Sequence, residues 1–110
     1  DLVRALVDVV GPAQAKFLLY SGQRIDAAEA ARIGLVNRVV ADAALAETVE
    51  SLARAIAANA PLSIRAAKLA IAAEDPDAIA AAIAACFDSA DYREGRAAFA
   101  AKRPPRFQGR

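Results

Sequence analysis

The sequence predicts a mainly α-helical protein, and three observations carry this prediction. Alanine, the residue with the highest helix propensity, occupies 32 of the 110 positions. Apolar residues recur at helical spacing over most of the chain, whereas β-branched residues gather in one short run. Glycine, proline and aspartate divide the chain at intervals typical of helix starts and ends. Because only 5% of the residues are aromatic, we expect a thin core in which helices pack closely through small side chains.

The first third of the chain contains three expected helices. Asp1 can cap the first helix, and Gly11-Pro12 ends it and opens the second, with proline in the first helical turn. Gly22 ends the second helix. The run Asp26-Ala-Ala-Glu29 has the spacing of a capping box and predicts a short third helix that Gly34 closes.

The run Leu35–Val40 differs from its surroundings, because it is short and rich in β-branched residues, and it predicts a strand. A single strand leaves its backbone N–H and C=O groups unpaired, and the chain offers only a faint second strand around Gln23-Arg24-Ile25. We therefore expect this strand to join a sheet supplied from outside the chain. The start at Asp1 rather than at Met fits the same expectation, that the chain is a fragment.

Residues 41–110 are expected to form four further helices and an irregular basic tail, separate from residues 1–40, which hold the strand. The first of these helices is expected to start with a cap at Asp42, to carry an apolar seam of Leu45, Val49, Leu52 and Ile56, and to end at the break Asn59-Ala60-Pro61. The second is expected from about Leu62 to Ala73, and Asp75-Pro76 is expected to cap the third. A second capping box, Asp91-Tyr-Arg-Glu94, is expected to open the fourth helix, which extends to about Lys102.

Composition excludes several classes of function. The net charge of +1 gives no support to a nucleic-acid partner. The absence of histidine removes the commonest general base, the commonest metal ligand and the usual catalytic triads. One cysteine cannot form a disulfide within the chain, and no apolar run reaches the about 18 residues of a membrane span. We expect no metal site and no membrane partner.

Isolated reactive residues have simpler structural explanations. Helix capping or a solvated face explains the carboxylate pairs better than acid–base catalysis does; these pairs are Asp26/Glu29, Glu47/Glu50, Glu74/Asp75/Asp77 and Asp88/Asp91. Cys86, with no histidine to activate it, is expected to be a core thiol. Gly95 lies near the start of the last expected helix, where glycine costs about 1 kcal/mol relative to alanine. We expect another helix or a neighbouring subunit to pack against Gly95.

The C-terminal residues combine aromatic rings with cations, namely Phe99, Lys102, Arg103, Arg106 and Phe107. Phe99 and Lys102 are three residues apart and share one helix face. A ring beside an ammonium group suits a ligand with a flat base and a phosphate. Spacing alone leaves open a second interpretation, a buried phenylalanine and a cation favoured at a helix C-terminus.

Several segments, in the right order and spacing, resemble the crotonase (enoyl-CoA hydratase/isomerase) family. Ser21–Ala30 and Gly34–Val40 are similar to that family's "TG..I.A.EA...GLVN.VV" run. Asn59–Leu62 with Lys68 is similar to its "APLA…K" segment, and Asp91–Pro104 to its closing "D..EG..AF.EKR.P" run. Ala101 departs from the pattern, because an acidic residue is usual there.

The resemblance implies that the chain is the C-terminal helical trimerisation segment of the crotonase ββα spiral fold. It implies that an N-terminal region, upstream of Asp1, supplies the sheet, the oxyanion hole and the catalytic carboxylates, so that this chain holds no catalytic residue. It also assigns Phe99 and Lys102 to the adenine and phosphate end of coenzyme A. The implied partners are an acyl-CoA substrate, with no further cofactor, and other copies of the chain in a trimer or a dimer of trimers.

The activity that the resemblance implies is enoyl-CoA hydration, a lyase reaction of cytoplasmic fatty-acid metabolism, with this chain alone inactive. An enoyl-CoA isomerase or another crotonase activity is an alternative, because the residues that decide between them would lie upstream. A non-catalytic helical association module is a second alternative.

Overall fold

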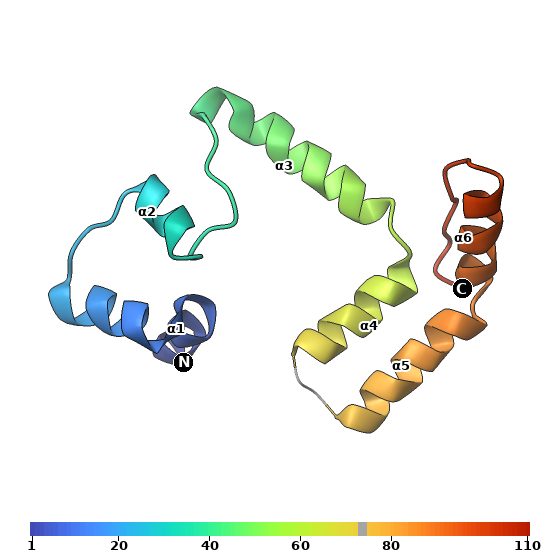
Figure 1. Ribbon diagram of the computed structural model, residues 1–110, viewed down its shortest axis with the longest axis horizontal. Helices are drawn as coiled ribbons and strands as arrows, with labels where there is room; N and C mark the ends of the chain where they lie inside the picture. The colour runs from blue at the N-terminus through green and yellow to red at the C-terminus, as the bar shows by residue number, and fades with distance from the viewer. Residues whose placement is uncertain (73–74) are drawn as a thin grey trace. The chain divides into compact units, whose positions relative to one another are not determined.

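The computed structural model describes residues 1–72 and 75–110, and all of the secondary structure in these residues is helical. The helices are α1 (Leu2–Ser21), α2 (Ala27–Arg32), α3 (Asp42–Ala57), α4 (Pro61–Ile71), α5 (Pro76–Asp88) and α6 (Ala90–Ala100) (Figure 1). The prediction of a mainly helical segment is confirmed. Two residues named above, Ala73 and Glu74, lie outside the described residues. The chain forms two compact units, Asp1–Ala46 and Glu47–Arg110, and the predicted division after residue 40 stays a prediction.

In the first unit, α1 consists of two helical segments joined at a kink. Gly11 has φ 79° and ψ 162°, outside the helical region, and Pro12 follows it. The two helices predicted on either side of Gly11-Pro12 therefore form, in direct succession. Gly22 ends the second segment in the left-handed conformation, with φ 61°. Ala15, which is 1% exposed, is the buried residue of α1.

The short helix α2 has the predicted start and end. Its N-cap is Asp26, whose carboxylate accepts a hydrogen bond from the Glu29 N–H at 2.8 Å. The Glu29 carboxylate does not complete the capping box but binds the guanidinium group of Arg32, at 2.6 and 2.5 Å. Gly34, at φ 79°, then turns the chain so that the Leu35 N–H donates to the Ala30 carbonyl at 2.9 Å.

At Leu35–Val40 the described structure has bends and irregular backbone, and the predicted strand, which would pair with a sheet outside the chain, stays a prediction. The N–H groups of Leu35 and Val36 both donate to the Ala30 carbonyl, at 2.9 and 3.3 Å, and so satisfy the end of α2 instead of a ladder. A strand also requires a hydrogen-bonded neighbour, and the described residues provide none. The β-branched composition could not indicate where such a neighbour would come from.

In the second unit, α4 packs against α5 and α5 packs against α6 (Figure 1). Pro61 starts α4, as predicted from the Asn59-Ala60-Pro61 break, and the Asn59 side chain donates to the Ala55 carbonyl at the end of α3. Asp75 caps α5 by accepting from the Asp77 N–H at 3.0 Å. These local signals set the helix limits of the unit.

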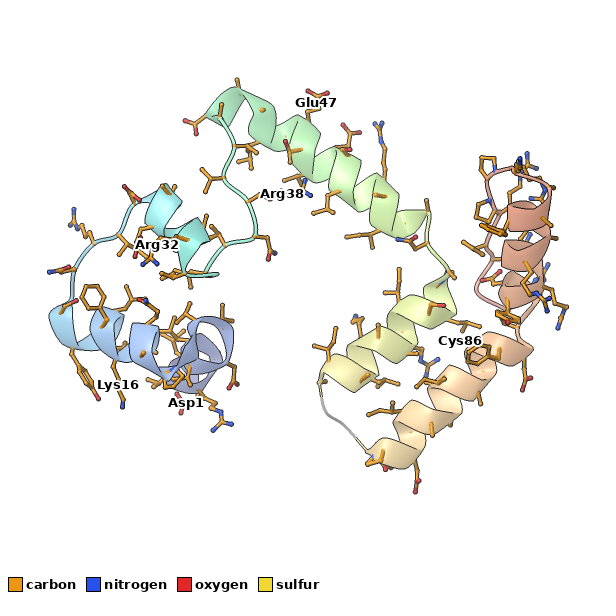
Figure 2. All side chains as sticks on the ribbon, in the orientation of Figure 1. Asp1, Lys16, Arg32, Arg38, Glu47 and Cys86 are labelled. Carbon is orange, nitrogen blue, oxygen red and sulfur yellow. The ribbon has the colours of Figure 1, made fainter. Side chains whose placement is uncertain are left out.

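Large apolar side chains remain exposed on the helices. Among the described residues the buried apolar side chains are those of Ala15, Ala30, Ala66 and Ala98. The predicted seam of α3 is half exposed along its length, from Val49 at 57% to Ile56 at 49%, and α3 has no buried residue (Figure 2). The core is thus thinner than expected. Contiguous apolar surface of this kind marks an interaction site.

Candidate functional site

The C-terminal tail folds back along α6 and is held there by a buried carboxylate. Asp91 is 3% exposed, and its two carboxylate oxygens accept hydrogen bonds from the N–H groups of Gln108 and Gly109, each at 2.7 Å. The Asp91 N–H donates in turn to the Arg110 carbonyl at 3.0 Å. The prediction that Asp91 caps α6 is wrong. Ser89 is the cap, accepting from the Tyr92 N–H at 2.9 Å, because Asp91 lies inside the first turn and faces the tail.

Glu94, one turn further along α6, holds the tail at a second point. We call the contacts of the Asp91 carboxylate with the tail the Asp91 clip, and those of the Glu94 carboxylate the Glu94 clip. Its carboxylate binds the Arg103 guanidinium through two hydrogen bonds, at 2.6 and 2.8 Å, and accepts a third from the Arg106 N–H at 2.9 Å. Bidentate charge-assisted pairs of this kind are among the stronger hydrogen bonds in proteins. The Arg103 guanidinium, followed by the Arg106 N–H, lowers the pKa of Glu94 from its ordinary 4.5 to about 2. The clip therefore stays ionised well into the acid range.

Gly95 faces the tail of its own chain. A Cβ atom built on Gly95 would lie 3.5 Å from the nearest carbon of the Phe107 ring, which is an ordinary van der Waals distance. Among the described residues this neighbour is the tail and not another helix, and the predicted contact with a neighbouring subunit stays a prediction. Gly95 also lies in the middle of α6, because the helix starts at Ala90 and not at Asp91.

The two predicted binding residues lie together where α6 ends. Phe99 is in the last turn of the helix and is 88% exposed. Lys102 follows the helix, and its N–H donates to the Phe99 carbonyl at 3.2 Å. Lys102 has φ 51°, and in the described part of the chain it is the one non-glycine residue with positive φ. The Arg103 N–H donates back to the Ala98 carbonyl at 3.0 Å, which completes a helix ending that usually has glycine at the position of Lys102.

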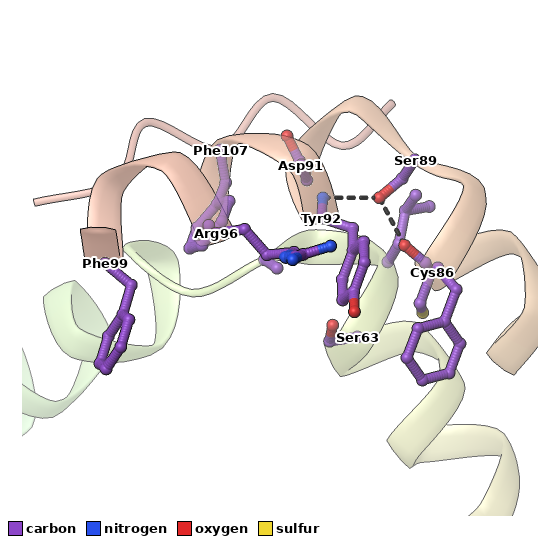
Figure 3. A pocket seen from close by; sticks show the side chains of 12 residues that line it. Ser63, Cys86, Ser89, Asp91, Tyr92, Arg96, Phe99 and Phe107 are labelled. Atoms are coloured by element: carbon purple, nitrogen blue, oxygen red, sulfur yellow. Dashed lines mark hydrogen bonds between the residues drawn. The ribbon is translucent and has the colours of Figure 1, made fainter. Parts of the chain in front are cut away.

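A pocket of about 450 Å³ adjoins this end of the molecule, between the start of α4, the end of α5, α6 and the tail. Phe99 lies at one end of the pocket and Cys86 at the other, with Tyr92 and Arg96 between them (Figure 3). The Phe87 and Tyr92 rings make an edge-to-face contact, with centroids 5.2 Å apart. Lys102 is not among the residues that line the pocket.

The predicted C-terminal constellation divides into two groups. Arg103 binds Glu94 and Phe107 packs on Gly95, so both stabilise the tail, whereas Phe99 and Lys102 remain available to a ligand. The sequence interpretation of Asp91 and Glu94 as a capping box does not predict that their carboxylates hold the tail. Their spacing of three residues fits a capping box as well as contacts with the tail, so the sequence carries no signal that distinguishes the two.

Cys86 is half buried, and its thiol donates to the Ala82 carbonyl of the preceding turn at 3.2 Å. Within residues 1–72 and 75–110, no three His, Cys, Asp or Glu side chains lie close enough together to hold a metal ion. None of the helices described there has the length and apolar character that a membrane span requires.

Comparison with known proteins finds a matching family model and similar solved structures. Residues 2–110 match the family model described as enoyl-CoA hydratase/isomerase. Over 98% of this chain, the structure matches a crystal structure of an enoyl-CoA hydratase from Bacillus anthracis, with a TM-score of 0.89 and 35% identity, and covers 45% of that chain. An enoyl-CoA hydratase/carnithine racemase from Magnetospirillum magneticum matches equally well, with a TM-score of 0.89, 42% identity, 98% of this chain covered and 42% of that chain.

Curated relatives agree with this assignment. The chain is 44% identical over 101 residues to a short-chain-enoyl-CoA hydratase of Clostridioides difficile, covering 86% of this chain and 65% of the relative. It is 41% identical over 109 residues to a putative enoyl-CoA hydratase of Thermus thermophilus, covering 93% of this chain and 43% of the relative. The chain thus spans from two fifths to two thirds of the length of these relatives. It belongs to the enoyl-CoA hydratase/isomerase family, which is the crotonase family.

Proposed function

We propose that this chain is the C-terminal part of an enoyl-CoA hydratase, a lyase that adds water to the double bond of a 2-enoyl-CoA thioester in fatty-acid metabolism. The names of the relatives support this proposal, since they include the Clostridioides difficile enzyme and a crotonyl-CoA hydratase of Syntrophomonas wolfei that is 40% identical over 106 residues. In this reaction charge develops on the thioester oxygen, and two preorganised N–H donors stabilise it. In this proposal the donors and the catalytic carboxylates lie in a part of the protein outside this chain.

This chain contributes to the site through Phe99 and Lys102. The observation that carries the assignment is the pairing of a ring that is 88% exposed with a lysine in a left-handed turn, three residues apart at one helix end. The Phe99 ring stacks on the adenine base, because aromatic rings and bases offer flat apolar faces to one another. The Lys102 ammonium pairs with a phosphate of the coenzyme.

The second contribution is assembly into a trimer or a dimer of trimers in the cytoplasm. The half-exposed seam of α3, with Leu52 at 53%, and the exposed Ile71 of α4, at 85%, support an apolar interface with residues outside the chain. Since the chain has no catalytic carboxylate of its own in this proposal, it is inactive without that remaining region.

Steady-state kinetics with crotonyl-CoA test the proposal in the full-length protein that carries this chain. The Lys102→Ala variant should raise KM by about tenfold, the value of one charge-assisted hydrogen bond, and leave kcat within about twofold. The exposed Lys16→Ala on α1 is the matched control, with KM unchanged. An unchanged KM for Lys102→Ala would remove Lys102 from the coenzyme site.

An isomerase activity is the second candidate, favoured by one relative of Escherichia coli named 1,2-epoxyphenylacetyl-CoA isomerase, which is 35% identical over 109 residues. The same protein incubated with a 3-enoyl-CoA in place of crotonyl-CoA distinguishes the two. Formation of the 2-enoyl isomer without hydration of crotonyl-CoA would favour the isomerase.

A further inference from the structure

The backbone of Lys102 is the unusual feature at the end of α6. Lysine rarely adopts φ 51°, and the helix ending formed here normally has glycine or asparagine at that position. Strained backbone of this kind persists only where surrounding contacts hold it, and it is concentrated at ligand-binding sites. The contacts that hold Lys102 therefore bear on what its side chain does.

Two sets of hydrogen bonds hold the turn, one on each side of Lys102. On the helix side, the N–H groups of Lys102 and Arg103 donate to the carbonyls of Phe99 and Ala98, at 3.2 and 3.0 Å. On the tail side, the Glu94 carboxylate binds the Arg103 guanidinium and the Arg106 N–H. Glu94 thus fixes Arg103, which directly follows Lys102, through its guanidinium group, and fixes the tail further along through the Arg106 N–H.

Glu94 does not neutralise the lysine that it helps to hold. Its carboxylate is paired with Arg103, and among the ion pairs of the described residues none includes Lys102. The side chain of Glu94 is 24% exposed and that of Arg103 is 44% exposed, so the clip is also partly shielded from water. The pKa of Glu94, lowered to about 2, keeps the carboxylate ionised not only at neutral pH but also well into the acid range.

We propose that Glu94 is a positioning residue for the nucleotide end of the substrate, holding the left-handed turn that directs the Lys102 ammonium to a phosphate. This inference rests on the proposed function, because it takes Lys102 as a ligand of coenzyme A. Glu94 itself does not contact the coenzyme in this account. It acts through Arg103 and the backbone of residues 102–106.

The test compares two substrates in the full-length protein, crotonyl-CoA and crotonyl-pantetheine, which lacks the nucleotide and its phosphates. Glu94→Gln removes the negative charge of the carboxylate, whereas Arg103→Lys keeps the positive charge but cannot form the two parallel hydrogen bonds of the guanidinium group. Glu29→Gln is the matched control, because Glu29 forms the same kind of bidentate pair with Arg32 on α2. Lys102→Ala is measured in parallel.

The expected result is a KM for crotonyl-CoA raised by about two- to fivefold in both clip variants, the equivalent of one partly exposed ion pair. Their kcat, their KM for crotonyl-pantetheine and both parameters of Glu29→Gln should not change. An equal change with both substrates, or no change with either, would overturn the positioning role. If Lys102→Ala also left KM for crotonyl-CoA unchanged, the coenzyme assignment would fail together with this inference.

Discussion

The seam of α3 and the α6–tail region (Ala90–Arg110) differ in whether their side chains find partners within this chain. In the α6–tail region the carboxylates of Asp91 and Glu94 are paired with groups of the tail, and the Asp91 side chain is buried. In α3 the apolar seam is about half exposed, and no residue of the helix is buried. These polar contacts are completed within one chain, although they join residues from 9 to 18 positions apart. Apolar seams must be covered by another element, which for α3 lies outside the described contacts.

The largest expected effect comes from a charge in the α3 seam. If the proposed oligomer buries this seam, Leu52→Asp should dissociate it, because a fully buried leucine contributes about 1.5–3 kcal/mol and the new carboxylate would be buried without a partner. Analytical ultracentrifugation at equal protein concentration measures the loss. Glu47→Lys, off the seam of the same helix, is the control that should keep the assembly. An intact oligomer in the Leu52→Asp variant would show that the seam is not an interface.

The next effect is on the tail itself. Asp91→Ala leaves the N–H groups of Gln108 and Gly109 without their acceptor, which should lower the free energy of unfolding by about 1–3 kcal/mol. Chemical denaturation measures this loss, and amide exchange should become faster at those two residues. Asp88→Ala, near the end of α5, serves as the comparison and should have little effect. Unchanged amide exchange at Gln108 and Gly109 would show that the Asp91 carboxylate does not hold the tail.

A smaller effect depends on pH. Glu94 has its pKa lowered to about 2 in the folded protein, so its contribution to stability is fully present above its ordinary value of 4.5. The contribution is lost as the pH falls from there through about 2. The Tm difference between the wild type and Glu94→Gln should therefore be constant from pH 7 to about 5 and then shrink toward pH 2. A difference that does not depend on pH would exclude the ion pair as its cause.

The smallest effect is a gain. Gly95→Ala places a Cβ at 3.5 Å from the Phe107 ring, an ordinary contact, and removes a glycine from the middle of α6. The variant should be more stable by up to about 1 kcal/mol in thermal unfolding. Ala97→Gly, on the same helix, should show the opposite sign. A destabilised Gly95→Ala would mean that the Phe107 ring cannot accommodate a methyl group.

Helix limits could be predicted from sequence where a local residue determines them. Asp26, Asp75 and Gly22 act as predicted, because a cap or a left-handed turn involves only the neighbouring residues. The strand predicted at Leu35–Val40 stays a prediction, since its pairing depends on a neighbour that the described residues do not contain. The spacing of Phe99 and Lys102 leaves two interpretations open, and their assignment to coenzyme A, which the family resemblance implies, stays a prediction. The clips at Asp91 and Glu94 could not be predicted, because the return of the tail along α6 has no periodic pattern.

We infer that the α6–tail region is satisfied within this chain, whereas the α3 seam is covered by residues outside it. Amide hydrogen exchange on the 110-residue chain and on the proposed full-length protein distinguishes the two regions. The amides of Gln108 and Gly109 should be protected in both samples, and those of Val49 and Leu52 in the full-length protein alone. Equal protection of α3 in both samples would contradict the account.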